Sequence, residues 1–283
     1  MDDKIAIKIK GHEKFVLREG WLTKGLFAVE KNRKVFLGDF GADVLGVGTN
    51  MVKAIRYYMQ AFGLIEENQQ QGARLSDIGT LIAKYDPYIE EDFTLCLLHS
   101  RIASNEERAT TWYLFFNQRE LVEFTKADLY DYIKRELLVK YGKTFPESSV
   151  KDDIDVLLNM YGKYDLSSDP EDKMHCPLAN LGLISTDGDM YYKSSPDIRK
   201  VDSDMVLLEI SRMLETQDSV SIEAIGNQLE SVFNISWVQT NELLDVLDRE
   251  DVIRVDRTAG LDMIYPISIP APTEIMKNHY EGR

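Results

Sequence analysis

The sequence is poor in cysteine: its 283 residues include only Cys96 and Cys176, which lie far apart. This excludes a disulfide framework and a zinc site of the C-x-x-C kind, and it indicates a reducing compartment, so a cytoplasmic location is expected. Long apolar runs are also missing, and the N-terminus has no continuous hydrophobic stretch. We therefore predict neither a membrane-spanning helix nor a secretory signal. Since 44% of the residues are hydrophobic, the chain can bury a globular core.

An excess of positive charge is missing as well, because the formal net charge is -15. As a whole, the chain is therefore a poor candidate for nonspecific binding to a polyanion. The charge is nevertheless uneven: residues 1–65 hold eleven Lys and Arg against seven Asp and Glu, or 11 − 7 = +4, which leaves −15 − 4 = −19 for the rest. If a nucleic acid binds, we expect it to meet a continuous cationic surface near the N-terminus.

The common catalytic signatures are absent, including the phosphate-binding P-loop, G-x-G-x-x-G, H-E-x-x-H and G-x-S-x-G. The densest group of polar residues is the segment GHEKFVLREGWLTKG, residues 11–25. Imidazole and carboxylate groups can move protons, and Arg and Lys can hold phosphate. The candidate catalytic residues for phosphodiester cleavage are therefore His12, Glu13 and Glu19, with Arg18 and Lys24 as phosphate ligands. The same residue types also suit a solvated strand and a helix cap, so whether the chain is an enzyme stays open.

The first 85 residues predict a winged-helix-like unit. The alternation in KIAIKI predicts a strand over residues 4–9, and helices are expected over 20–31 and 42–45. A third helix should begin at a cap on Thr49 or Asn50 and end near Phe62, before a hairpin with its tip near Gln69–Gln71 and Arg74.

The third helix predicts the DNA-binding residues. At 100° per residue, Met51, Ile55, Tyr58 and Phe62 form one apolar stripe. The opposite face would carry the residues expected to contact DNA, together with the helix start and the hairpin: Asn50, Lys53, Arg56, Tyr57, Gln60 and Arg74. The alternative interpretation is an ordinary solvated face, since helix-turn-helix shapes also serve protein contacts.

The remainder predicts a helical middle region, 86–165, and a second winged-helix-like unit, 166–283. The predicted elements of the middle region are helices over 88–103, 125–141 and 149–161, a strand over 112–116, and a polar linker over 162–176. A hairpin should turn at Asp187-Gly188-Asp189, before helices over 205–214, 222–229 and 237–247 and strands over 252–255 and 263–267. Ser221 is expected to cap the helix over 222–229. The fold class is thus mainly α with small β-hairpins. The second unit's outer face is acidic, with Glu242, Asp245, Asp248 and Glu250, which favours protein contact over DNA.

Two strings suggest a family. GHEKFVLREGWLTKGLFAV, followed by LGVGTNMVKAIRYYMQAFGL, resembles the SspB-type component of single-stranded DNA phosphorothioation and phage-defence gene clusters, a family first catalogued as a domain of unknown function. The resemblance is strongest over residues 11–65. The positions that match the two strings are His12, Phe15, Arg18, Gly20, Trp21, Asn50, Lys53, Arg56 and Tyr57.

The resemblance implies a DNA-binding component of a phosphorothioate modification system that binds or nicks DNA. Its implied partners are DNA, a cysteine desulfurase, an ATPase and a PAPS-reductase-like enzyme, with no membrane, and a homodimer is left open. Mg²⁺ or Mn²⁺ would be the cofactor only of a nicking endonuclease. The alternatives are a non-catalytic protein-interaction adaptor and a winged-helix regulator.

Overall fold

The computed structural model describes residues 6–38, 40–162 and 175–282, and most of the predicted linker, residues 163–174, lies outside them. The chain divides into two compact units, Met1–Ser194 and Ser195–Arg283. The predicted division instead placed boundaries after residues 85 and 165. Here the hairpin that follows the linker belongs to the first unit, because its second strand pairs with a strand at Glu123–Phe124. Mainly helical structure with small antiparallel sheets confirms the predicted fold class.

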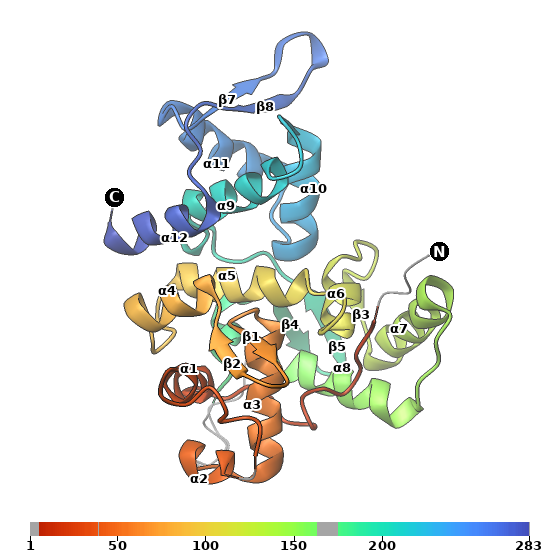
Figure 1. Cartoon of the computed structure of the whole chain (residues 1–283). Coiled ribbons are helices and arrows are strands. Elements are labelled where there is room, and N and C mark those ends of the chain that lie inside the picture. The colour runs from red at the N-terminus through yellow and green to blue at the C-terminus, as the bar shows by residue number, and fades with distance from the viewer. Residues whose placement is uncertain (1–5, 39, 163–174, 283) are drawn as a thin grey trace. The chain divides into compact units, whose positions relative to one another are not determined.

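The first unit begins with three helices and a hairpin, in the predicted order (Figure 1). These elements are α1 (Trp21–Lys31), α2 (Gly41–Leu45), α3 (Thr49–Ala61), β1 (Ile65–Asn68) and β2 (Gly72–Leu75). The strands pair in antiparallel register from Ile65 opposite Leu75 to Asn68 opposite Gly72. Gly48 occupies the N-cap of α3 and no side chain caps that helix, so the predicted cap at Thr49 or Asn50 is wrong.

The rest of the first unit contains one helix that is buried on nearly every side, α5 (Asp92–Ala103). Ten of its twelve residues are buried, so this helix belongs to the core. It follows α4 (Asp77–Tyr85) and packs against α6 (Thr110–Phe116), which in turn packs against α7 (Lys126–Tyr141) and α8 (Glu147–Tyr161). The strands β3 (Glu123–Phe124), β4 (Ile184–Asp187) and β5 (Met190–Lys193) form a sheet in the order β3-β5-β4. The predicted turn at Asp187-Gly188-Asp189 is confirmed, since Asp187 pairs with Met190.

Two predicted strands of the first unit are wrong. The segment Trp112–Phe116 is helical, because its aromatic side chains are buried among α5, α7 and α8 and packing overrides their preference for strands. Residues 6–8 of the predicted N-terminal strand have no regular structure. The backbone N–H groups of Lys8 and Lys10 donate to side chains instead of to a neighbouring strand: Lys8 N to Thr110 Oγ1 at 3.1 Å and Lys10 N to Asp153 Oδ1 at 2.6 Å.

The second unit repeats the order of three helices and a hairpin and adds a short strand. It contains α9 (Ser203–Leu214), β6 (Val220–Ser221), α10 (Ile222–Phe233), α11 (Trp237–Arg249), β7 (Ile253–Asp256), β8 (Met263–Pro266) and α12 (Pro272–Glu281). The sheet order is β6-β8-β7. Ser221 caps α10 as predicted, since its side chain accepts a hydrogen bond from Ala224 N. No helix in the described part of either unit has the length and apolarity to cross a membrane.

Candidate nucleic-acid interface

Three cations from distant parts of the first unit gather beside α3. Lys8 precedes α1, Arg56 lies on α3, and Arg108 lies in the turn before α6. Burial lowers the pKa of Lys8, and the positive charges of Arg108 and then Arg56 lower it further, so the three side chains share one electrostatic environment. We call Lys8, Arg56 and Arg108 the cationic cluster.

The cluster is joined to α3 by Gln60 and Tyr57. Arg108 Nη1 donates to Gln60 Oε1 at 3.1 Å, and the ammonium of Lys8 lies 5.4 Å from the centre of the Tyr57 ring. Tyr57 is only 2% exposed, so the predicted outward position of its side chain is wrong. The Tyr57 phenol has a pKa far above its ordinary value because of its burial. Its ring makes a cation–π contact with the Lys8 ammonium.

One carboxylate partly neutralises the cluster. Glu67, on β1, lies 2.9 Å from Arg56 Nε and also accepts a hydrogen bond from the amide of Gln60. Glu67 and Glu13 raise the pKa of Lys8, which opposes the effect of the two arginines. The cluster thus holds three cations against two nearby acids, and Glu67 fixes Arg56 and Gln60 in place.

The other predicted DNA-binding residues are dispersed over the first unit. Lys53 is exposed on α3 and donates to Asn50 Oδ1 at 3.3 Å. Lys24 donates to the carbonyl of Leu45 at 3.0 Å and so links α1 to the end of α2. Arg18 stacks on Trp21, with its guanidinium carbon 5.7 Å from the ring centre. On the hairpin, Arg74 forms an ion pair with Glu66. Of the predicted set, the structure therefore brings only Arg56, Gln60 and Tyr57 into the cationic cluster's surroundings.

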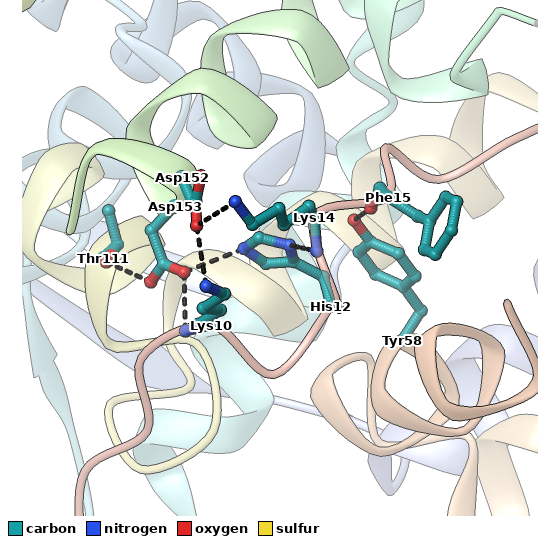
Figure 2. Close-up of polar contacts among 8 residues, drawn as sticks. All are labelled: Lys10, His12, Lys14, Phe15, Tyr58, Thr111, Asp152 and Asp153. Atoms are coloured by element: carbon teal, nitrogen blue, oxygen red, sulfur yellow. Dashed lines mark hydrogen bonds and ion pairs between the residues drawn. The ribbon is translucent and has the colours of Figure 1, made fainter. Parts of the chain in front are cut away.

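His12 and the two glutamates occupy different environments. The His12 side chain is fully buried, with Nε2 2.8 Å from Asp153 Oδ1 and Nδ1 3.1 Å from the backbone nitrogen of Lys14 (Figure 2). Glu13 and Glu19 are both exposed, and no contact among the three is found in the described residues. With both ring nitrogens occupied, His12 holds local structure here. A catalytic role for His12, Glu13 and Glu19 stays a prediction.

One group in the described residues of the second unit offers three potential metal ligands. Asp202, Asp204 and His279 place one ligand atom each within 4.8 Å of one another. Asp202 already caps α9 through the Asp204 N–H, and His279 Nδ1 lies 2.8 Å from Asp204 Oδ2. Mg²⁺ prefers an octahedral set of oxygen ligands, so an imidazole and a helix N-terminus make this group a poor match for that ion.

Comparison with known proteins identifies the family. A family model described as "Protein of unknown function (DUF4007)" matches residues 9–280. The chain belongs to this family. It is similar to a solved structure described as "SspB crystal structure", with a TM-score of 0.85 and 24% identity, over 98% of this chain and 90% of that one.

A second structure, "Magnesium ion-bound SspB crystal structure", gives a TM-score of 0.84 at 24% identity, over 97% of this chain and 88% of that one. No curated protein matches the sequence. The family resemblance seen in the two N-terminal strings is thus confirmed, and the shared fold extends well beyond residues 11–65.

The sequence alone does not predict several residues of this interface. Lys8 is one of many cations in the basic segment, and Arg108 stands in a loop with no recognisable pattern. The sequence does contain a signal for Asp153. This residue lies on the same helical face as Val150 and Leu157, so a carboxylate interrupts an apolar stripe. A carboxylate in that position predicts a buried acid with specific partners.

Proposed function

We propose that this chain is a DNA-binding component of a phosphorothioation system and that its cationic cluster contacts the DNA backbone. The observation that supports this proposal is the convergence of Lys8, Arg56 and Arg108 from three segments. Keeping like charges close together is unfavourable unless an anion or an acid offsets them, and Glu67 and Glu13 offset only part of the charge. Phosphate oxygens would complete the neutralisation. Likeness to the SspB structures supports the choice of pathway.

The exposed part of α3 extends this surface. Lys53 lies about one turn before Arg56 and Asn50 about two turns before it, toward the start of the helix. Backbone contacts of this kind fix the position of a protein on DNA without reading sequence. A helix N-terminus adds backbone N–H donors that favour an anion. We therefore expect phosphate contacts along the first half of α3 and at the cluster.

Binding of short single-stranded and duplex DNA, measured by fluorescence anisotropy over a range of salt concentrations, tests the proposal. Substituting Ala for Lys8, Lys53 or Arg108 should weaken binding and lower the dependence of log K on log salt, by about 0.9 per lost contact on a duplex or about 0.7 on a single strand. Lys277→Ala, an exposed lysine on α12, is the matched control for the loss of one positive charge. If all four variants bind equally, the proposal is wrong.

A second candidate, the protein-interaction adaptor, is supported by the surface of α11. Trp237 and Val238 are 40% and 69% exposed at its start, beside the acidic residues further along the helix. An exposed aromatic residue next to carboxylates suits a partner protein with a basic surface. Loss of partner capture in Trp237→Ser with DNA binding unchanged would assign the adaptor role to this helix.

A further inference from the structure

Residues 8–15, here called the strap, are held against the first unit by one buried carboxylate. Asp153 on α8 is 1% exposed. Its Oδ1 accepts from Lys10 N at 2.6 Å and lies 2.8 Å from His12 Nε2, and its Oδ2 accepts from the hydroxyl of Thr111 at 2.7 Å (Figure 2). Two of these three partners belong to the strap, and the third belongs to the first turn of α6.

The direction of the His12 hydrogen bonds follows from its neighbours. Because Lys14 N donates to Nδ1, that nitrogen is an acceptor, and the hydrogen of the neutral ring must reside on Nε2. Nε2 therefore donates to Asp153. A buried carboxylate is stable only when such donors replace water, so each partner is needed.

Further contacts also hold the strap, beginning with Lys8 N, which donates to Thr110 Oγ1 at 3.1 Å. Lys10 and Lys14 place their ammonium groups 2.9 and 3.1 Å from Asp152 Oδ2 (Figure 2). Tyr58 on α3 donates its hydroxyl hydrogen to the carbonyl of Phe15 at 2.7 Å. Between these points, Gly11 lies so near Tyr57 that a Cβ would fall 2.3 Å from the ring. The strap thus spans from α8 to α3.

The strap's backbone conformation needs this support. Lys10, Glu13 and Lys14 have φ angles of 63°, 51° and 68°, in the left-handed region that is unfavourable for a residue with a side chain. A free peptide would not keep three such residues. Loss of the contacts with Asp153 should therefore release the strap from its bound conformation.

Lys8 is the residue through which the strap reaches the cationic cluster. It stands two residues before Lys10, and its ammonium lies over the Tyr57 ring. We propose that Asp153 is a positioning residue, which holds the strap so that Lys8 joins Arg56 and Arg108 in contacting DNA. This inference rests on the proposed DNA-binding function and extends it, because it makes an interior carboxylate on α8 part of the interface.

A double-mutant cycle on the full chain tests the proposal. DNA affinity is measured by anisotropy for the parent, Asp153→Asn, Lys8→Ala and the double variant. Asp153→Asn should weaken binding several-fold and lower the salt dependence by about one phosphate contact. In the Lys8→Ala background it should have no further effect, since the residue through which it acts is gone. Equal weakening in both backgrounds would show a general structural role and overturn the proposal.

Amide hydrogen exchange gives a second readout that needs no DNA. Asp153→Asn should raise exchange at Lys10 and Lys14, whose N–H groups are held by Asp153 and His12. Unchanged exchange in the strap would also overturn the proposal. If Asp153→Asn does not fold, Asp152→Asn loosens the strap from outside the core and should give the same pattern. Asp155→Asn, whose partner is Lys126, is the matched control on α8.

Comparing Lys8→Ala with Arg108→Ala separates the positioning role of Asp153 from the proposed DNA-binding function. If Arg108→Ala weakens DNA binding and Lys8→Ala does not, the cluster binds DNA but the positioning role of Asp153 is wrong. If no cation of the cluster affects binding, the proposed function itself fails, whatever the exchange data show.

Discussion

The third helices of the two units, α3 and α11, have the same place in the element order but opposite charge. Each helix comes after two helices with fewer residues and before a hairpin. The solvent side of α3 carries Lys53 and Arg56, whereas α11 carries Glu242 and Asp245. Arg257, on the adjoining loop, donates to Asp245 at 2.9 Å and neutralises only part of the acidic face of α11. A shared element order thus does not decide what a helix binds; the side chains on its surface do.

Acidic side chains of α8 and α11 also differ in how far apart in sequence their partners lie. In the first unit, the carboxylate of Asp153 links segments that are far apart in sequence. In the second unit, Asp248 of α11 accepts a hydrogen bond from the nearby Val255 N at 2.8 Å, and Asp245 accepts one from Arg257. Long-range polar contacts bring residues of separate segments together, so we expect the first unit's surface to depend more on its interior.

The largest expected effect tests this dependence directly. Asp153→Ala should lower the free energy of unfolding by about 3–5 kcal/mol, because it leaves buried donors of Lys10, His12 and Thr111 without an acceptor. Asp245→Ala, at the surface of α11, should change it by less than about 0.5 kcal/mol. Urea denaturation followed by circular dichroism measures both. Similar losses in the two variants would remove the contrast between the units.

The next effect concerns pH. Lys193 on β5 donates to the carbonyls of Phe115 and Gln118, and burial lowers the pKa of its ammonium to about 7. A lysine whose folded pKa lies below its unfolded value destabilises the fold below pH 7, and this destabilisation is relieved as the pH rises toward 10. The groups with shifted pKa values among the described residues of the second unit are Asp197, Arg199 and Asp256, which lie near the surface.

Stability measured from pH 6 to pH 10 checks this expectation. The parent should gain up to about 3 kcal/mol relative to Lys193→Met over that range, since each unit of pKa shift corresponds to about 1.4 kcal/mol and the two carbonyls favour the charged form. A constant difference between the two proteins would show that Lys193 stays protonated throughout.

The smallest effect is on affinity. Glu67→Gln should strengthen DNA binding about threefold, or about 0.7 kcal/mol, because it frees Arg56 while keeping a hydrogen-bonding side chain of the same shape. Glu242→Gln removes one negative charge from α11 and should leave affinity unchanged. Titrations at one salt concentration suffice. An equal gain in affinity for both variants would show that net charge alone sets the affinity and that the cationic cluster is not the binding site.

Much of the fold followed from local chemistry. Thr125 forms a capping box with Asp128 and starts α7 where the sequence predicts it, and Gly142 ends that helix with a φ of 62°. The turn after Asp187 and the cap at Ser221 were predicted for the same reason, because caps and tight turns depend on a few adjacent residues. The strands predicted for Trp112–Phe116 and for the described residues 6–9 of the segment 4–9 are wrong, since burial and distant side chains decide the structure there.

The site was predicted less well than the fold. Helical periodicity identified Lys53, Arg56 and Gln60 on the outer half of α3, but it also placed Tyr57 there, and the strap covers that ring. Nothing local indicated that Lys8 and Arg108 approach α3. The basic segment was expected to form a continuous cationic surface, yet Lys10 and Lys14 pair with Asp152, and Arg56 pairs with Glu67.

By itself, the sequence determined most of the helices, the hairpins, the family and the uneven charge, because periodicity, caps and composition are properties of neighbouring residues. Only the tertiary structure decided which cations stand together and which are neutralised. Those pairings join α8 to the strap and α3 to β1, across separations that no local pattern records. Charge interactions depend on distance in space, and the packed fold is what sets that distance.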